Sequence, residues 1–185
     1  MPVQKITKDE ILQKSIDVFR TKGYYNTSMQ DLAKACGLMK GSFYYYFDSK
    51  EILMKELLTS VHNYLKIKVL TIAYDETLSP EERLETMLKK LGKVLLEKEG
   101  GCIIGNTTLE TAGRVAEFQP ILKGIIGDWI SATQHIFSAK KSPEMALRLA
   151  QQTVIEFEGA VMMVKLFGDK TLLGDCFVRA MVRLN

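Results

Sequence analysis

Residues 38–47 read LMKGSFYYYF, and five aromatic side chains follow one another in this stretch. The chain has eight phenylalanines and seven tyrosines, so one third of them occupy these five positions. In a helix, Phe43, Tyr46 and Phe47 share one face because they are three and four residues apart. The spacing therefore predicts a short helix over about 39–46 that buries Phe43, Phe47 and the body of Tyr46.

The other face of this helix carries polar groups. Lys40 lies one turn before Tyr44, and Tyr45 follows directly. A helix of this size fits the major groove of DNA, where a tyrosine can hydrogen-bond a phosphate and pack its ring on a sugar or a thymine methyl group. We expect Lys40, Gly41, Ser42, Tyr44 and Tyr45 to face DNA. The alternative for Tyr44 is that it only covers a neighbouring helix.

Two further helices precede this one. Residues 7–10 and 27–30 both have the pattern of a capping box, in which a side-chain oxygen and a glutamate or glutamine satisfy free backbone N–H groups. Gly23 ends the first helix. Ala33 is small where two helices cross closely, and Gly37 lies where the chain must bend. Two short helices around such a turn indicate a helix-turn-helix unit.

The rest of the chain also indicates helices. A long fourth helix is expected over about 49–73, and Ser79–Pro80 and Ser142–Pro143 each place a capping serine before a proline at the first helical position. The last two helices are expected over 143–168 and 170–184. Runs rich in valine and isoleucine are too short for a sheet. The predicted fold is all-α, with about nine helices.

The composition is ordinary for a globular protein, with 46% hydrophobic and 25% charged residues. No apolar run approaches the roughly 20 residues that span a membrane, and the N-terminus lacks an apolar signal segment, which favours a cytoplasmic protein. Residues 1–50 hold eight basic and five acidic side chains, whereas the remainder holds 17 of each sign. All the excess positive charge therefore lies in the first part of the chain, as a polyanion-binding module would have it.

No catalytic motif is present. The two histidines have no pairing pattern, and phosphate-binding glycine loops and nucleophile triads are missing from the sequence. The three cysteines are far apart and odd in number, which argues against disulfides and a zinc site. We predict that the chain is not an enzyme and needs no cofactor and no metal.

Residues 8–54 resemble the DNA-binding domain of the tetracycline-repressor-like (TetR) family of bacterial regulators. The pieces that carry the resemblance are Ile11–Leu12, Phe19, Lys22–Tyr24, Thr27–Met29, Asp31–Ala33, Gly37, Lys40–Gly41, Phe43–Tyr44, Phe47 and Ser49–Glu51. The resemblance implies an N-terminal helix-turn-helix domain over 1–48 and a larger helical ligand-binding and dimerisation domain over 49–185. It also implies double-stranded operator DNA, a small-molecule effector and a second copy of the chain as partners, with no membrane association.

Geometry and resemblance together predict the DNA contacts. Thr27 and Ser28 begin the second helix, whose N-terminus suits a phosphate. Lys50 begins the fourth helix, where a cation opposes the helix dipole unless an anion lies nearby. Met39 stands where the family often has serine, so the third helix lacks a side-chain cap, which costs about 1 kcal/mol. The expected DNA-binding residues are Thr27, Ser28, Met39, Lys40, Gly41, Ser42, Tyr44, Tyr45 and Lys50.

Candidate effector contacts are polar, aromatic or thiol side chains within the apolar helices of the second domain. They are Cys102, Asn106, Glu110, Trp129, Thr133 and His135. Each has a plain alternative as a core or surface residue. Cys102 follows two glycines at an expected helix start, where the dipole lowers a thiol pKa, so it is also a candidate redox or electrophile sensor.

The sequence thus favours a transcriptional repressor that binds a palindromic operator as a homodimer and is released by a small molecule. Two alternatives stay open: an activator or co-repressor-dependent regulator of the same fold, and a helical ligand- or protein-binding module that has lost DNA binding. We expect the last two helices to form the dimer interface. The apolar residues expected there are Phe157, Ala160, Val161, Val164, Leu166, Phe177 and Met181, and the small Gly159 and Ala160 would allow close helix approach.

Overall fold

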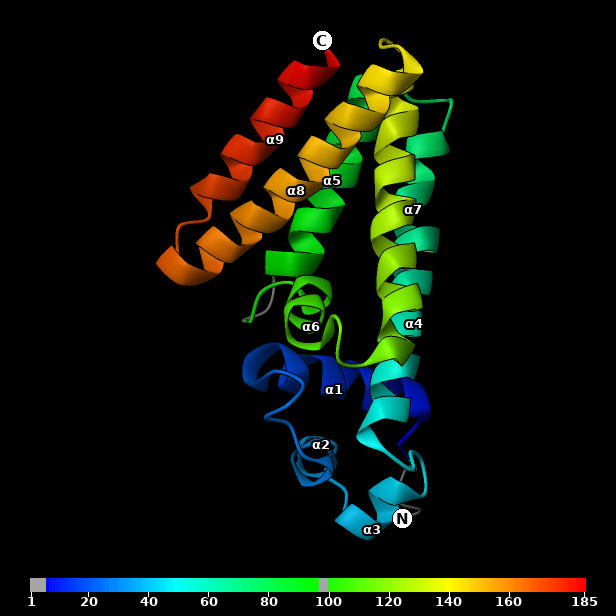
Figure 1. The fold of residues 1–185 in the computed structure, drawn as a ribbon, viewed down its shortest axis with the longest axis vertical. Coiled ribbons are helices and arrows are strands. Elements are labelled where there is room, and N and C mark those ends of the chain that lie inside the picture. The colour runs from blue at the N-terminus through cyan, green and yellow to red at the C-terminus, as the bar shows by residue number, and fades with distance from the viewer. Residues whose placement is uncertain (1–5, 97–99) are drawn as a thin grey trace. The chain divides into compact units, whose positions relative to one another are not determined.

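The computed structural model describes residues 6–96 and 100–185, and these residues form nine α-helices, two 3-10 helices and no strand (Figure 1). The helices are α1 (Lys8–Lys22), α2 (Met29–Ala35), α3 (Lys40–Tyr44), α4 (Lys50–Lys68), α5 (Pro80–Leu96), α6 (Ile103–Thr111), α7 (Gln119–Ser138), α8 (Pro143–Phe167) and α9 (Thr171–Leu184). The 3-10 helices are η1 (Leu70–Tyr74) and η2 (Ala116–Phe118). The all-α prediction is confirmed.

The chain divides into two compact units. Unit 1 comprises Met1–Val61 and Ile103–Leu122, and unit 2 comprises His62–Cys102 and Lys123–Asn185. Compactness thus groups α6 and the first part of α4 with α1, α2 and α3. The expected functional boundary between residues 48 and 49 stays a prediction, because it concerns what the segments do and not how densely they pack.

The start of α1 follows the sequence pattern, whereas the start of α2 corrects it. Thr7 caps α1 and Glu10 completes the capping box. The box of α2 is one residue later than predicted, because Ser28 is the N-cap and Asp31 is its partner. Thr27 does not cap α2; its hydroxyl is directed back toward α1 and donates to the Gly23 carbonyl at 2.6 Å.

Two helices are shorter than predicted. Helix α3 covers only Lys40–Tyr44, and its N-cap residue Met39 makes no side-chain hydrogen bond, as expected. Helix α4 ends at Lys68 and not at residue 73, because Val69 leaves the helical region with φ −122° and ψ −57° and the chain continues as η1. The apolar spacing persists through this break, which is why periodicity alone predicted one continuous helix.

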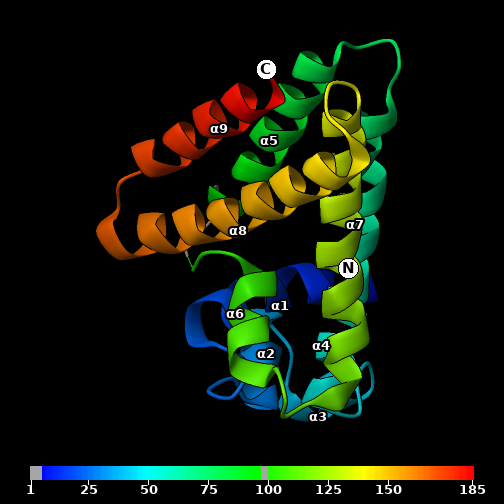
Figure 2. The ribbon, with the colours of Figure 1, turned by 45° about the horizontal axis from the view of Figure 1, so that its top comes forward.

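Unit 2 has an aromatic centre. The Trp129 ring meets the Phe157 ring edge to face at 5.0 Å, and Phe157 stacks on Phe177 at 5.7 Å. Helices α8 and α9 lie side by side in both ribbon views (Figure 2). Both Ser–Pro starts are confirmed, at Pro80 and Pro143. No helix in the described part of the chain is long and apolar enough to cross a bilayer.

Candidate nucleic-acid interface and effector groove

The aromatic stretch divides into buried and exposed rings as its spacing predicts. Phe43 and Phe47 are fully buried, with ring centroids 6.2 Å apart. Tyr46 is half-buried, and its hydroxyl donates to the Ile6 carbonyl at 3.0 Å. Tyr44 is 40% exposed and Tyr45 is 79% exposed. The two phenylalanines anchor α3 in unit 1, whereas the Tyr44 and Tyr45 rings reach the surface.

The outer surface of α3 is open and cationic. Lys40 is exposed, and its Nζ lies 6.0 Å from the Tyr44 ring centroid, which is within reach of a cation–π contact. A Cβ added at Gly41 would meet no atom within 4 Å, so the backbone there is accessible. Ser42 is exposed, and Met39 is 80% exposed. We name Met39, Lys40, Gly41, Ser42, Tyr44 and Tyr45 the α3 face.

Ser28 and Thr27, at the start of α2, differ in accessibility. Ser28 is exposed, although its hydroxyl and its N–H both donate to the Asp31 carboxylate. Lys22 pairs with the same carboxylate, and its hydrogen bond, together with those from Ser28, holds the pKa of Asp31 far below the usual range. Thr27 is only 2% exposed and uses both its N–H and its hydroxyl within the turn. The Thr27 side chain is therefore a structural element and not an accessible phosphate ligand.

Lys50 is the first residue of α4, and its ammonium group binds backbone carbonyls. Its Nζ donates to the carbonyls of Tyr24 at 2.7 Å and Thr27 at 2.8 Å, and it lies 4.4 Å from the Tyr24 ring centroid. Burial lowers the Lys50 pKa, and the carboxylates of Glu51 and Glu110 oppose that shift. An ammonium group has three donors, so two carbonyls leave one N–H for a further acceptor.

Helices α8 and α9 expose an apolar stripe. On α8, Ile155, Met162 and Leu166 are 72%, 57% and 70% exposed, and on α9 Val178 and Val182 are 63% and 68% exposed. Together with the half-buried Gly159, the α8 positions follow the four-three-four spacing of one helix face. We name these six residues the α8–α9 stripe.

The interface prediction named partly different residues. Phe157, Val161 and Val164 are at most 7% exposed, because they pack inside unit 2 of the same chain. Leu166 and Gly159 are the members of the predicted set that lie on the stripe. The sequence shows two apolar faces on this helix, and periodicity does not tell which of them the chain itself covers.

The sequence matches two family models. Residues 11–57 match the model of bacterial regulatory proteins of the tetR family. Residues 80–177, more than half of the chain, match the C-terminal domain of LmrA/YxaF-like transcriptional regulators. The chain belongs to the TetR family.

Individual TetR-family relatives resemble the chain over most of its length. The HTH-type transcriptional repressor DhaR of Mycobacterium sp. (strain GP1) is 25% identical over 165 residues, which cover 86% of this chain and 82% of DhaR. The crystal structure of a TetR regulator from Legionella pneumophila superposes with a TM-score of 0.87, at 23% identity and 97% coverage of both chains. That of AibR superposes with a TM-score of 0.71, at 17% identity and 94% and 95% coverage of this chain and of AibR.

The six candidate effector contacts are divided between the two compact units of this TetR-family chain. Asn106 and Glu110 belong to unit 1, and Glu110 accepts a hydrogen bond from the Tyr25 amide. Thr133 is fully buried, with its hydroxyl bonded to the Trp129 carbonyl of its own helix. His135 is exposed, and its ring packs on Tyr74 at 4.6 Å.

Cys102 and Trp129 lie in unit 2 and are buried. The Cys102 thiol hydrogen-bonds to the carboxyl group of Glu158, and Cys102 is only 4% exposed directly before α6. A thiol this deeply buried is not presented to a dissolved electrophile, which argues against the sensor role. Trp129 is 2% exposed, and its Nε1 has no hydrogen-bond partner among the described residues.

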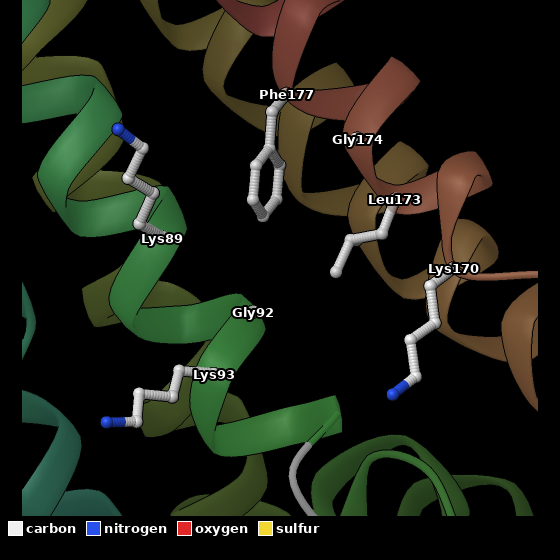
Figure 3. A pocket seen from close by; sticks show the side chains of 7 residues that line it. All are labelled: Lys89, Gly92, Lys93, Lys170, Leu173, Gly174 and Phe177. Atoms are coloured by element: carbon white, nitrogen blue, oxygen red, sulfur yellow. The ribbon is translucent and has the colours of Figure 1, made fainter.

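A groove of about 360 Å³ lies between α5 and α9, in unit 2 (Figure 3). It is lined by Lys89, Gly92, Lys93, Lys170, Leu173, Gly174 and Phe177. A Cβ at Gly92 would lie 2.8 Å from Phe177 Cζ, so glycine lets this ring approach α5. Leu173 and Phe177 give the groove an apolar part, and three lysines contribute to its lining, of which Lys89 pairs with Glu85 Oε1 at 2.6 Å. None of the six predicted effector contacts lines this groove.

Proposed function

We propose that the protein is a cytoplasmic transcriptional repressor that binds a palindromic operator as a homodimer and dissociates when a small molecule binds. The observation that carries the proposal is the α3 face, which is open and cationic above the buried rings of Phe43 and Phe47. Membership of the TetR family supports it. DhaR is named a repressor, and AibR was crystallised with isovaleryl coenzyme A and operator DNA.

Within the α3 face, we assign base reading to the region around Lys40 and Ser42, because a lysine can donate to guanine and a serine to any base. Tyr44 and Tyr45 are suited to phosphates and sugars. Ser28 and the remaining N–H of Lys50 are assigned to the DNA backbone, where contacts position the protein without reading sequence. The buried Thr27 side chain is not assigned a DNA contact.

The α8–α9 stripe supports the homodimer. Apolar side chains at such spacing on two adjacent exposed helices gain free energy when a second copy covers them. A two-fold dimer places two recognition helices on half-sites about 34 Å apart, one turn of DNA. An effector then releases the protein only to the extent that it binds the DNA-incompatible state more tightly. The groove between α5 and α9 is the candidate effector site.

Operator binding is tested on duplex DNA from the protein's own promoter, with a scrambled duplex as reference. Lys50→Ala weakens binding to both duplexes and lowers the salt slope by about one, with a larger loss on the promoter duplex because Lys50 also holds the carbonyls of Tyr24 and Thr27. Lys40→Ala changes the preference between operator variants. Equal binding of the wild-type protein to promoter and scrambled DNA would contradict specific repression, and identical behaviour of the two variants would contradict the division into reading and positioning.

The dimer is tested by introducing a charge on the stripe. Leu166→Asp makes the protein monomeric at micromolar concentration and reduces operator affinity, whereas Leu109→Asp does not. Leu109 is the matched control because it is an 84% exposed leucine on α6, outside the stripe. Sedimentation velocity distinguishes the two species. A wild-type monomer, or a dimeric Leu166→Asp variant, rules out this interface.

A further inference from the structure

The turn Gly23–Thr27, which joins α1 to α2, is held internally and by Lys50. Inside the turn, the Thr27 hydroxyl donates to the Gly23 carbonyl at 2.6 Å, and the Thr27 amide donates to the Tyr24 carbonyl at 3.3 Å. Lys50 then donates to the Tyr24 and Thr27 carbonyls. The next residue, Ser28, is the N-cap of α2, so the conformation of the turn sets the position at which α2 starts.

A carboxylate from far along the chain holds the other side of this turn. The Tyr25 amide donates to Glu110 Oε2 at 3.2 Å, across 85 positions of sequence. Gly23 has φ +79°, and a Cβ placed there would lie 2.6 Å from Glu110 Oε1. Glycine at position 23 therefore serves two purposes, because it allows the backbone angle and it leaves room for the Glu110 carboxylate.

The segment that carries Glu110 contacts the same turn at other points. The Tyr24 ring, 3% exposed, meets Phe118 of η2 edge to face at 5.3 Å. The Arg114 guanidinium lies 5.9 Å from the centroid of the Tyr25 ring. Three side chains of the segment 110–118 thus contact two adjacent tyrosines of the turn, and this segment belongs to the same compact unit as α1–α3.

We propose that Glu110 is a positioning residue for operator binding, which holds the Gly23–Thr27 turn, and through it α2 and α3, in the DNA-binding arrangement. The negative charge matters because a carboxylate accepts an amide hydrogen bond more strongly than a neutral group does. It also faces the Lys50 ammonium across the turn. The inference rests on the proposed operator binding and adds a residue outside the helix-turn-helix to it.

The sign of the effect separates positioning from simple electrostatics. Removing a negative charge near a DNA-binding surface strengthens binding to any DNA, because repulsion of phosphates decreases. If Glu110 positions the turn, removing its charge weakens operator binding specifically and leaves binding to scrambled DNA unchanged or slightly stronger. For operator affinity, the positioning role therefore predicts a decrease, whereas simple electrostatics predicts an increase.

The test compares Glu110→Gln with Glu117→Gln. Glutamine keeps the size and removes the charge, and Glu117 is an exposed carboxylate seven positions later in the same segment. We expect Glu110→Gln to weaken operator binding about tenfold, the order of one charge-assisted hydrogen bond, with an unchanged salt slope because no phosphate contact is lost. Glu117→Gln leaves operator affinity within about twofold. Affinities come from fluorescence anisotropy at several salt concentrations.

Hydrogen exchange gives a readout that does not depend on DNA. The Tyr25 amide exchanges faster in Glu110→Gln than in the wild type, while amides of α8 are unchanged and the unfolding midpoint moves little. Unaltered operator affinity, an equal loss in Glu117→Gln, or unaltered Tyr25 exchange overturns the proposal. A wild-type protein that does not distinguish its promoter from scrambled DNA instead refutes the proposed function, and the affinity role of Glu110 is refuted with it.

Discussion

Helix α3 and the turn Gly23–Thr27 belong to the same compact unit and use their polar groups in opposite ways. The α3 face presents Lys40, Tyr44 and Tyr45 outward, above two fully buried phenylalanine rings. The turn directs its carbonyls to Lys50 and its Tyr25 amide to Glu110. A surface that reads a partner must stay exposed, so the rigidity that it needs is supplied by a neighbouring segment whose hydrogen bonds are internal.

The largest loss of stability is expected at Phe43, whose buried ring anchors the α3 face in unit 1. Phe43→Ala removes a fully buried ring and destabilises unit 1 by about 3–5 kcal/mol. Tyr45→Ala, on the exposed side of the same segment, changes stability by less than about 0.5 kcal/mol and weakens DNA binding. Urea unfolding followed by circular dichroism measures both. A Tyr45→Ala variant as unstable as Phe43→Ala would contradict the division of the aromatic stretch into two faces.

The α3 face could be predicted because its information is local. Phe43, Tyr46 and Phe47 are three and four residues apart, and helical spacing alone separates them from Tyr44 and Tyr45. Helix starts at Thr7, Pro80 and Pro143 were predictable for the same reason, since a cap involves residues within one turn of each other. The α2 start was wrong by one residue, because the Thr27 hydroxyl bonds backward to Gly23.

The support of the turn was not predictable in this way. Glu110 is a polar residue within an apolar helix, a pattern that fits an effector contact as well as a bond to a distant backbone. Only the fold brings it to the Tyr25 amide. The groove between α5 and α9 has the same property, because its lining residues come from two segments, 89–93 and 170–177, that are far apart in sequence. The sequence shows these residues, but it does not show that the two segments lie together.

A smaller loss of stability is expected from alanine substitution at Gly23 and Gly37, which lie before and after α2. Gly23→Ala forces alanine to φ +79° and displaces the Glu110 carboxylate from the Tyr25 amide, and we expect a loss of about 2 kcal/mol, from the backbone angle and from the lost hydrogen bond. Gly37→Ala also has a positive φ, of +70°, but its Cβ would meet no atom within 4 Å, so about 1 kcal/mol is expected. Urea unfolding measures the difference. In a Glu110→Ala background the excess cost at Gly23 disappears, and persistence of the full excess would mean that the carboxylate does not occupy this space.

The smallest effect is expected at Glu158, which contrasts with Glu110. Glu110 accepts a backbone N–H, whereas Glu158 Oε1 is buried without a hydrogen-bond partner among the described residues. Burial raises the pKa of Glu158, and the hydrogen bond with Cys102 opposes that shift only partly. Because the folded pKa exceeds the unfolded value, ionisation of Glu158 destabilises the folded state. The penalty is absent below the unfolded pKa, where the carboxyl is neutral in both states, and it is complete above the folded pKa.

Glu158→Gln therefore stabilises the protein by about 1 kcal/mol near pH 8 and loses this advantage near pH 4. Asp175→Asn is the control, because Asp175 is an exposed carboxylate on the neighbouring α9. Thermal unfolding across this pH range measures both variants. If Glu158→Gln is instead destabilising at pH 8, the charged carboxylate has a partner that stabilises it, and a cationic group or a ligand amine beside Cys102 and Glu158 becomes the explanation to test.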